Sequence, residues 1–299
     1  MNNSVKSCVI GSYPIKIDPM ELMNDYFNKK DVSWDKYISK VAKDMTNAGI
    51  NIISDGQTRD SMVEIFTRKL KGCRVRKRTE IVNKIEYIKP ITIEDQKYLR
   101  KIIPRNVQIK TAITGPYTIA KSCLDNYYDN EKELAFDLAK ALREEAKVLQ
   151  NYVDFISIDE PYFSNFMPDY AKELINTITS KLKCPTTLHV CGDVTKIIPE
   201  LIDLSVNILS HEFMASPHLF DKFNDYDFQQ KLCVGAVRSD NSTIESVEEI
   251  TNHIKKAIEL FGDKVIQISP DCGQRLLSRA VAFHKLKNLA IAGEIINGR

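Results

Sequence analysis

Short apolar runs rich in β-branched residues alternate along the chain with longer stretches in which apolar residues recur every three or four positions. The short runs are typical of buried parallel strands, and the longer stretches are typical of amphipathic helices. We expect eight strands, at residues 8–10, 50–53, 107–112, 155–158, 186–190, 206–209, 232–236 and 265–268. The helices expected between them include residues 33–48 (with Ser33 as N-cap), 131–150, 168–182, 243–261 and 276–296.

Strands that alternate with helices in this way predict an α/β protein, folded as a single (β/α)8 TIM barrel over residues 1–299. One segment departs from the alternation, at about residues 70–92, where a basic cluster precedes alternating apolar and polar positions. We interpret this segment as an inserted β-hairpin beside the barrel mouth. An exposed charged ribbon is the simpler interpretation of the basic cluster, and contact with an anionic ligand or an acidic partner protein is the alternative.

The composition of the chain narrows the function classes. Its 299 residues are 43% hydrophobic and 27% charged, and the formal net charge of +2 gives no reason to expect nucleic-acid binding. No apolar run approaches the roughly 20 residues that span a bilayer, and the N-terminus does not resemble a secretory signal. We therefore expect a cytoplasmic protein with no membrane partner. The seven cysteines are widely spread, so we expect free thiols rather than a disulfide framework.

Residues of metal-ligand type follow three of the expected strands. His189 and Cys191 are two positions apart, so on an extended strand both side chains project to one face. Glu212 and Cys272 each stand at the end of another apolar run. The C-terminal ends of the strands carry the active site in a (β/α)8 barrel. We therefore expect these four side chains to form a tetrahedral zinc site.

Six motifs of the chain resemble, in the same order, motifs of the catalytic domain of cobalamin-independent methionine synthase. The resemblance is to the short form of that family, which lacks the N-terminal folate-binding barrel, and it covers essentially the whole chain. The motifs are Ile10-Gly11-Ser12, Met62-Val63-Glu64-Ile65-Phe66, Gly115-Pro116-Tyr117-Thr118, Ile158-Asp159-Glu160-Pro161, His189-Val190-Cys191-Gly192 and Asp271-Cys272-Gly273.

The resemblance implies a methyltransferase of methionine biosynthesis that methylates the thiol of L-homocysteine, and it implies that the four residues named above bind one catalytic zinc ion. It also implies that Ile10, Gly11 and Ser12 hold the homocysteine carboxylate and that Asp159 holds its ammonium group. Zinc coordination would deprotonate the substrate thiol, whose free pKa is about 8.5. We expect Glu212, as the carboxylate ligand, to yield its position when the substrate sulfur enters.

Gln57 is a departure from the long enzymes, which have a glutamate in contact with the substrate amino group at this position. A neutral amide can still form a hydrogen bond with the ammonium or the carboxylate group, with less charge assistance. We expect Gln57 and Asp159 to be the residues that position the amino-acid part of the substrate during catalysis.

Three further departures concern the methyl donor. Ser122 stands where the long enzymes stack the folate pterin on a tryptophan, and Asn165 stands where they have a folate-binding glutamate. The loop at residues 236–241 contains no histidine, whereas the long enzymes use a histidine there to protonate the leaving amine of methyltetrahydrofolate. A methyl-corrinoid donor leaves as Co(I) and needs no proton. We therefore expect methylcobalamin or a methylated corrinoid protein as the donor.

Three alternatives remain open at this point. The donor could be methyltetrahydrofolate, or the accepting thiol could belong to another molecule such as coenzyme M, which has no ammonium group for Asp159 to bind. A non-catalytic zinc-binding or corrinoid-binding barrel is the third alternative. It is disfavoured because closed structural zinc sites usually lack a carboxylate ligand such as Glu212.

Overall fold

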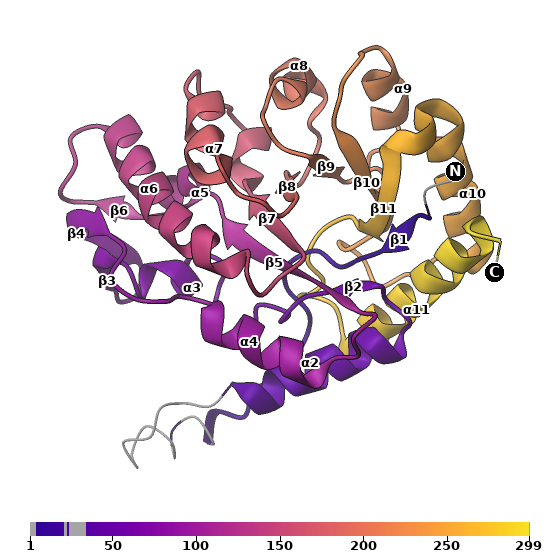
Figure 1. Cartoon of the computed structure of the whole chain (residues 1–299), viewed down its shortest axis with the longest axis horizontal. Helices are drawn as coiled ribbons and strands as arrows, with labels where there is room; N and C mark the ends of the chain where they lie inside the picture. Colours follow the sequence, from indigo (N-terminus) through magenta and orange to yellow (C-terminus); the bar gives the residue numbers. More distant parts are fainter. Residues whose placement is uncertain (1–3, 21–22, 24–33, 299) are drawn as a thin grey trace.

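The computed structural model of the chain describes residues 4–20, 23 and 34–298. Within these residues an eight-stranded parallel sheet is surrounded by helices (Figure 1). Its strands are β1 (Lys6–Ser7), β2 (Ile52–Ile53), β5 (Gln108–Thr114), β7 (Phe155–Asp159), β8 (Thr186–His189), β9 (Ile208–His211), β10 (Lys231–Val237) and β11 (Val265–Pro270).

The sheet is a nearly closed barrel. Neighbouring strands follow the order β1-β11-β10-β9-β8-β7-β5-β2, so from β2 to β11 each barrel strand lies beside the barrel strand that follows it in the chain. An isolated parallel bridge between Cys8 and Ile52 joins the two end strands. The predicted (β/α)8 barrel is therefore confirmed. Because all the strands are parallel, their C-terminal ends and the loops that follow them meet at one end of the barrel.

The α-helices of the described residues pack around the outside of the strands (Figure 1). The three longest helices begin at capping residues. The Ser246 hydroxyl accepts a hydrogen bond from Glu249 N at the start of α10, the Asn130 side chain accepts one from Lys132 N at the start of α6, and the Ser278 hydroxyl accepts one from Val281 N at the start of α11. The helices are α2 (Asp35–Asn47), α3 (Glu64–Thr67), α4 (Ile93–Ile102), α5 (Pro116–Ser122), α6 (Glu131–Leu149), α7 (Ala171–Thr179), α8 (Ile198–Ile202), α9 (Leu219–Asn224), α10 (Val247–Phe261) and α11 (Arg279–Ile296). Short 3-10 turns are η1 (Pro161–Ser164), η2 (Thr195–Ile197) and η3 (Gly262–Lys264).

The element boundaries differ from the sequence prediction mainly at the N-terminal part of the chain. The first strand was expected at residues 8–10, but β1 lies at Lys6–Ser7 and only Cys8 adds a bridge. Val9 and Ile10 are buried although they lie beyond the strand, so their apolar character reflects burial rather than strand pairing. The expected helix 33–48 corresponds to α2, and the predicted N-cap Ser33 lies outside the described residues.

The two ends of the described chain are held together by side-chain amide contacts. Asn297, which follows α11, accepts a hydrogen bond from Val5 N at 2.9 Å and donates one to Val5 O at 2.9 Å. These two contacts attach the entry into β1 to the last helix. The start of β1 is thus held both by its pairing with β11 and by the end of α11.

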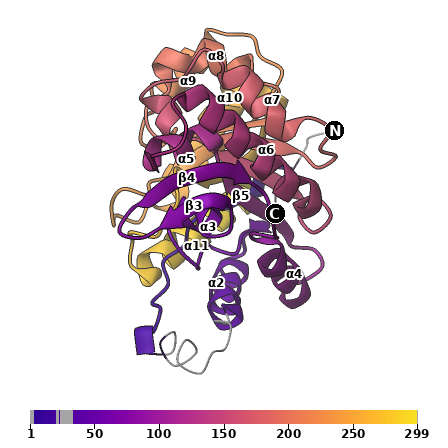
Figure 2. The same ribbon diagram turned by 90° about the vertical axis from the view of Figure 1, so that its left-hand side faces the viewer.

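The predicted insertion forms a β-hairpin, as expected. Its strands β3 (Lys71–Val75) and β4 (Thr79–Glu86) pair antiparallel, and a third strand, β6 (Leu124–Asp125), adds to β4 in parallel. Figure 2 shows the hairpin lying across the outside of the barrel, in front of α3. Lys71 pairs with Glu86 at 2.9 Å and Arg74 forms an ion pair with Glu80, so part of the basic cluster is neutralised.

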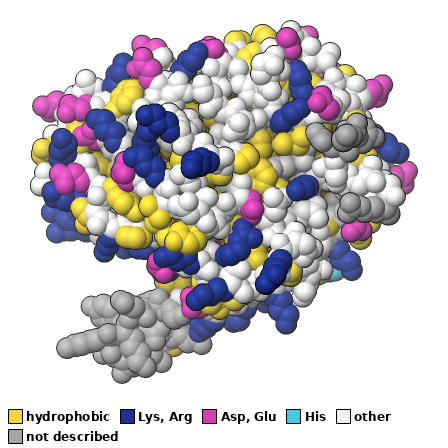
Figure 3. Space-filling view, viewed as in Figure 1, with side chains coloured by type: hydrophobic (Ala, Val, Ile, Leu, Met, Phe, Trp, Pro, Cys, Tyr) yellow, Lys and Arg dark blue, Asp and Glu magenta, His cyan; other side chains and the backbone are white. Residues whose placement is uncertain are grey.

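The face of the molecule seen in Figure 3 carries mixed charge. Figure 3 shows Lys and Arg side chains interspersed with acidic and hydrophobic ones over the face seen in Figure 1. Among the described residues, no helix combines the length and the apolar character that a membrane crossing would require.

The interior of the barrel contains a polar cluster that the apolar strand patterns did not indicate. Lys110 on β5 is 3% exposed, and its Nζ lies 3.1 Å from Cys8 Sγ. Cys8 Sγ lies 3.5 Å from Cys233 Sγ on β10. Cys8 is thus a direct polar partner of a buried ammonium group, and the nearby Cys233 thiol also interacts with it electrostatically.

Candidate metal centre and substrate pocket

Three side chains with metal-ligand atoms meet at the C-terminal end of the barrel. His189 is the last residue of β8, Cys191 follows it by two positions, and Cys272 follows the end of β11 by two positions. His189 Nε2 lies 3.0 Å from Cys191 Sγ, which lies 2.7 Å from Cys272 Sγ. The ligand atoms of all three lie within 4.8 Å of one another, and both cysteines are free thiols. These are the donor types that a zinc ion prefers.

Contacts around these side chains favour a thiolate at Cys272 and a protonated ring at His189. The hydrogen bond from the Cys191 thiol, together with His189, holds the pKa of Cys272 well below its usual range. Burial lowers the pKa of His189, but its hydrogen bond with Cys272 and the nearby Asp159 and Glu212 carboxylates outweigh burial and raise it to about 9. His189 Nδ1 lies 3.2 Å from Ser210 Oγ on β9, and this contact fixes the orientation of the ring.

Glu212, the fourth expected ligand, lies near this group but outside the 4.8 Å set. Its half-buried carboxylate accepts a hydrogen bond from the backbone N–H of Gly192, and burial raises its pKa. His211, the preceding residue, is buried. Its Nδ1 lies 3.2 Å from Val190 O, and its ring stacks on the ring of Phe223. Burial lowers the pKa of His211 to about 3, so this ring is neutral.

A cavity of about 300 Å³ adjoins the three ligands. All of the predicted substrate-binding residues line it, together with the three close ligand side chains, whereas Glu212 does not. The predicted site residues that line the cavity are Ile10, Gly11, Ser12, Gln57, Asp159, His189, Cys191 and Cys272. The loops after β1, β2, β7, β8 and β11 therefore converge on one pocket, as the barrel topology predicts.

Asp159 ends β7 at the floor of this pocket. Its carboxylate accepts a hydrogen bond from Ser157 Oγ at 2.6 Å, and only 5% of the residue is exposed. Burial raises the pKa of Asp159, while His189 and the Ser157 hydroxyl oppose this effect. The Asp159 carboxylate is mostly removed from water. A cation that enters the pocket would therefore stabilise its charged form.

Gln57 is held rigidly in an uncommon backbone conformation. Its φ is 47°, its N–H donates to Asp55 Oδ1 at 3.0 Å, and Arg275 donates to its carbonyl oxygen. Asp55 is fixed in turn by Gln96 Nε2 at 3.1 Å. The side chain of Gln57 is buried in the pocket wall, and its Nε2 has no hydrogen-bond partner in the described part of the structure. A buried donor without a partner is costly, so this amide is suited to an acceptor on a ligand.

Gly11 provides the space between the two polar groups. Its φ of 44° is a left-handed conformation that suits glycine, and a Cβ there would lie 3.2 Å from Gln57 Oε1 and 3.6 Å from Asp159 Oδ2. On the other side, Ser12 O accepts a hydrogen bond from Gln274 N at 2.7 Å. The first and last loops of the barrel thus form one wall of the pocket.

Two buried carboxylates near the pocket were named in the sequence only as members of motifs, without a role in the site. Glu160 accepts hydrogen bonds from Tyr117 N and from both N and Oγ1 of Thr118, at 2.9, 2.8 and 2.6 Å. Asp271 accepts from Met214 N and Ala215 N, at 3.0 and 2.8 Å, and so attaches the loop after β9 to the residue before Cys272. Each belongs to one of the six motifs, and its place in the motif was the available signal.

The residues whose departures concern the methyl donor lie outside the pocket lining. Ser122 ends α5, where its hydroxyl donates to Thr118 O at 2.7 Å, and Asn165 is exposed after η1. In the loop after β10, Arg238 Nε donates to Asp240 Oδ1 at 2.8 Å. In the described structure these side chains are engaged with the protein itself or with solvent.

Comparisons with known proteins identify the family and the fold of the chain. A family described as the catalytic domain of cobalamin-independent synthase matches residues 5–294. A methionine synthase of Methanocaldococcus jannaschii is 40% identical over 308 aligned positions, covering 96% of this chain and 98% of that protein. A methionine synthase of Methanothermobacter thermautotrophicus is 33% identical, with 95% and 98% coverage. A structure described as a B12-independent methionine synthase from Shewanella sp. W3-18-1, in complex with selenomethionine, superposes with a TM-score of 0.84 at 27% identity and 98% coverage of both chains.

Proposed function

The chain belongs to the family of cobalamin-independent methionine synthase catalytic domains, and from this premise we propose that it is a methyltransferase that forms L-methionine from L-homocysteine. The observation that carries the proposal is the pocket itself, where three soft metal-ligand atoms adjoin a buried carboxylate and an unpaired amide. The related Shewanella structure, which holds selenomethionine, supports a methionine-sized ligand.

The residues present fit one zinc ion. Two thiols and an imidazole within 4.8 Å of one another match the soft and borderline ligands that zinc prefers, and Glu212 is the proposed fourth ligand. A free thiol with a pKa of about 8.5 is mostly protonated at neutral pH. Bound zinc would stabilise the thiolate form of the homocysteine sulfur at this pH. The cysteines must be reduced to bind metal, so a cytoplasmic location is part of the proposal.

The polar groups of the pocket would orient the amino acid. Asp159 is buried and anionic when deprotonated, which suits the ammonium group of homocysteine. Gln57 Nε2 lacks an acceptor, and a substrate carboxylate near Gly11 and Ser12 would supply one. The Ile10-Gly11-Ser12 turn is open enough for close approach because Gly11 has no side chain. These contacts would fix the substrate sulfur relative to His189, Cys191 and Cys272.

We propose methylcobalamin or a methylated corrinoid protein as the methyl donor. The support is the set of departures at Ser122, Asn165 and the loop 236–241, none of which presents a folate-type contact to the pocket. A Co(I) leaving group needs no general acid, and the loop offers no histidine for that role. Methyltetrahydrofolate is the alternative donor. A different accepting thiol, such as coenzyme M, would leave Asp159 without an ammonium partner.

The test is methionine formation from homocysteine by the zinc-loaded protein, run in parallel with methylcobalamin and with methyltetrahydrofolate. We expect turnover with methylcobalamin and none with the folate. Turnover with the folate alone would overturn the donor assignment, and turnover of coenzyme M in place of homocysteine would overturn the substrate.

Zinc content of purified variants tests the metal centre separately. We expect Cys272→Ser to lose most of its zinc and its activity, while Cys184→Ser, which removes a half-buried thiol outside the pocket, keeps both. Undiminished zinc in Cys272→Ser would contradict the ligand set.

A further inference from the structure

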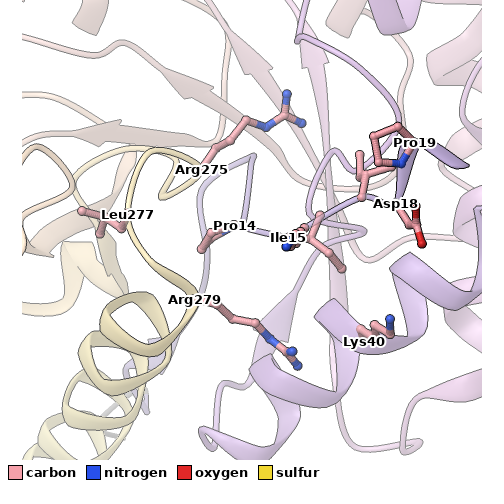
Figure 4. Close-up of a pocket in the computed structure, with 10 residues that line it drawn as sticks. Pro14, Ile15, Asp18, Pro19, Lys40, Arg275, Leu277 and Arg279 are labelled. Atoms are coloured by element: carbon pink, nitrogen blue, oxygen red, sulfur yellow. The ribbon is translucent and has the colours of Figure 1, made fainter.

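A second cavity, here called the basic cavity, lies beside the substrate pocket and has a volume of about 830 Å³ (Figure 4). It is bounded by the segment after β1, by α2 and by the segment that leads into α11. Figure 4 shows Lys40 projecting from α2 and Arg279 from the start of α11, with Asp18 and Pro19 on the neighbouring segment. A volume of this size can hold a drug-sized group.

The charges in the lining of the basic cavity are mostly positive. Four cationic side chains line it, Lys16, Lys40, Arg275 and Arg279, against the single carboxylate of Asp18. Arg279 is neutralised by Asp44, whose Oδ1 lies 2.8 Å from Arg279 Nη2. The remaining three cations exceed the one acidic group, so the cavity has a net positive charge.

The three remaining cations are not neutralised by other carboxylates. Arg275 donates to the carbonyl oxygens of Gln57 and Asp60, which carry no net charge. Lys16 and Lys40 form no ion pair within the described residues, and both side chains are exposed. Lys40 Nζ makes only a distant contact, 5.7 Å from the centre of the Tyr37 ring. Among the described residues, their ammonium groups have no carboxylate partner and can meet an anion.

The beginning of α11 adds to this positive character. Helix N-termini carry a partial positive charge and favour acidic residues in the first turn. The first turn of α11 has no acidic residue and instead begins with Arg279, although the helix is 18 residues long. An anion in the adjoining cavity would supply the negative charge that the sequence of the helix lacks.

The basic cavity and the substrate pocket have one lining residue in common, Arg275. A smaller hollow of about 280 Å³ shares lining residues with each of them. It shares Ile15 and Ile17 with the basic cavity and Ser61 with the substrate pocket. Arg275 lines all three spaces. An elongated molecule could therefore reach from the metal centre, past Arg275, into the basic cavity.

We propose that the basic cavity binds the anionic tail of the methyl donor, through a phosphate or carboxylate group, while the methyl group lies in the substrate pocket. This inference rests on the proposed methyltransferase function. The tail has two chemical sources: a corrinoid carries a phosphodiester in its nucleotide arm, and a folate carries the carboxylates of its glutamate tail. Lys16 and Lys40 provide point charges that attract either group, and Arg275 marks the passage between the two sites.

Direct anion binding is tested with inorganic pyrophosphate, titrated calorimetrically into the zinc-loaded full chain at low ionic strength. We expect the double variant Lys16→Ser/Lys40→Ser to bind pyrophosphate at least tenfold more weakly than the wild type. The matched control is Lys255→Ser/Lys287→Ser, which removes two exposed charges that do not line the cavity. Equal affinity in the wild type and both double variants would overturn anion binding at this cavity.

The donor assignment is tested by comparing methylcobalamin with methylcobinamide, which lacks the nucleotide arm and its phosphodiester. The ratio of kcat/KM for methylcobalamin to that for methylcobinamide should fall at least tenfold in Lys16→Ser/Lys40→Ser and not in the control. Methyltetrahydrofolate with one or three glutamates forms the second arm, and a loss confined to the triglutamate would assign the tail to a folate.

The two parts of the proposal fail separately. If pyrophosphate binding is lost in the variant but the donor ratios do not change, the cavity binds anions and the tail assignment is wrong. If no donor supports turnover, the proposed function fails, and the pyrophosphate titration alone decides whether the cavity binds anions.

Discussion

The Nζ atom of Lys285 lies 2.8 Å from Oε2 of Glu245 and 3.0 Å from Oε1, and the Lys285 side chain is completely buried. Glu245 Oε1 also accepts a hydrogen bond from Arg238 N at 2.8 Å. Glu245 O accepts another from Asn288 Nδ2 at 2.8 Å. The ion pair therefore connects α11 to the loop after β10, which borders the metal centre.

Lys285→Met should destabilise the protein strongly. The variant leaves the Glu245 carboxylate buried without its cation, and breaking a buried pair in this way typically costs about 3–5 kcal/mol of unfolding free energy. Urea denaturation measures the difference. The control is Lys287→Met on the same helix, whose exposed side chain should change stability by less than about 0.5 kcal/mol. The double variant Glu245→Gln/Lys285→Met should regain part of the loss, and no recovery would show that the pair is not the cause.

Glu160 should make stability depend on pH. Burial raises the pKa of its carboxyl group from 4.5 to about 7, against the hydrogen bonds from Thr118 and Tyr117 that favour the charged form. The folded state thus holds this proton more tightly than the unfolded state. Stability from this group is therefore present below pH 4.5 and is lost as the pH rises to about 7, by on the order of 3 kcal/mol in total.

The comparison of Glu160→Gln with the wild type isolates this effect. Unfolding free energies measured from pH 4.5 to 7.5 should fall more steeply in the wild type, because the variant has no proton to lose at this position. Glu248→Gln, which removes an exposed carboxylate on α10, should follow the wild-type profile. Parallel profiles for the wild type and Glu160→Gln would refute the assignment.

Gly11→Ala should impair substrate binding more than it impairs folding. The added Cβ would project between Gln57 and Asp159, at 3.2 and 3.6 Å from their oxygens, where the amino acid is proposed to bind. We expect the KM for homocysteine to rise about tenfold or more with zinc content unchanged. The left-handed φ also makes alanine unfavourable, by about 1–2 kcal/mol.

Gly262→Ala separates the two consequences of that substitution. Gly262 also has a positive φ, of 56°, but an added Cβ there would meet nothing within 4 Å. Its alanine variant should lose stability and keep the wild-type KM. If Gly262→Ala raised the KM to the same extent as Gly11→Ala, the effect would be one of general backbone strain.

The barrel could be predicted from the sequence because its strands are buried on both faces and therefore read as continuous apolar runs. The run at residues 265–268, for example, falls within β11 (Val265–Pro270). An apolar run indicates that residues are buried, but it does not show which of them pair with a neighbouring strand. For this reason the first strand was expected at residues 8–10, whereas β1 lies at Lys6–Ser7. The strand β6 (Leu124–Asp125) has only two residues, too few for any periodic pattern, and it exists because the hairpin offers an edge for pairing.

The candidate site was predictable where its residues follow a strand and share a spacing. His189 and Cys191 were found by the alternation of side chains, and Cys272 by its place after a strand. Glu160 and Lys285 were not found, because their burial depends on partners from distant segments, such as Thr118 and Glu245. A sequence shows that these residues are charged but does not show which charges the fold removes from water.

Glu212 should be the most easily replaced of the proposed zinc ligands. The imidazole of His189 and the thiols of Cys191 and Cys272 lie within 4.8 Å of one another, whereas the Glu212 carboxylate lies outside this set and accepts a hydrogen bond from Gly192. After dialysis against a weak chelator, Glu212→Gln should keep more than half of the wild-type zinc. Cys191→Ser should keep less than a tenth under the same conditions, since it removes one of the close ligands. Zinc loss as complete in Glu212→Gln as in Cys191→Ser would show instead that the carboxylate is a permanent ligand, and substrate sulfur would then have to enter by expanding the coordination rather than by displacing Glu212.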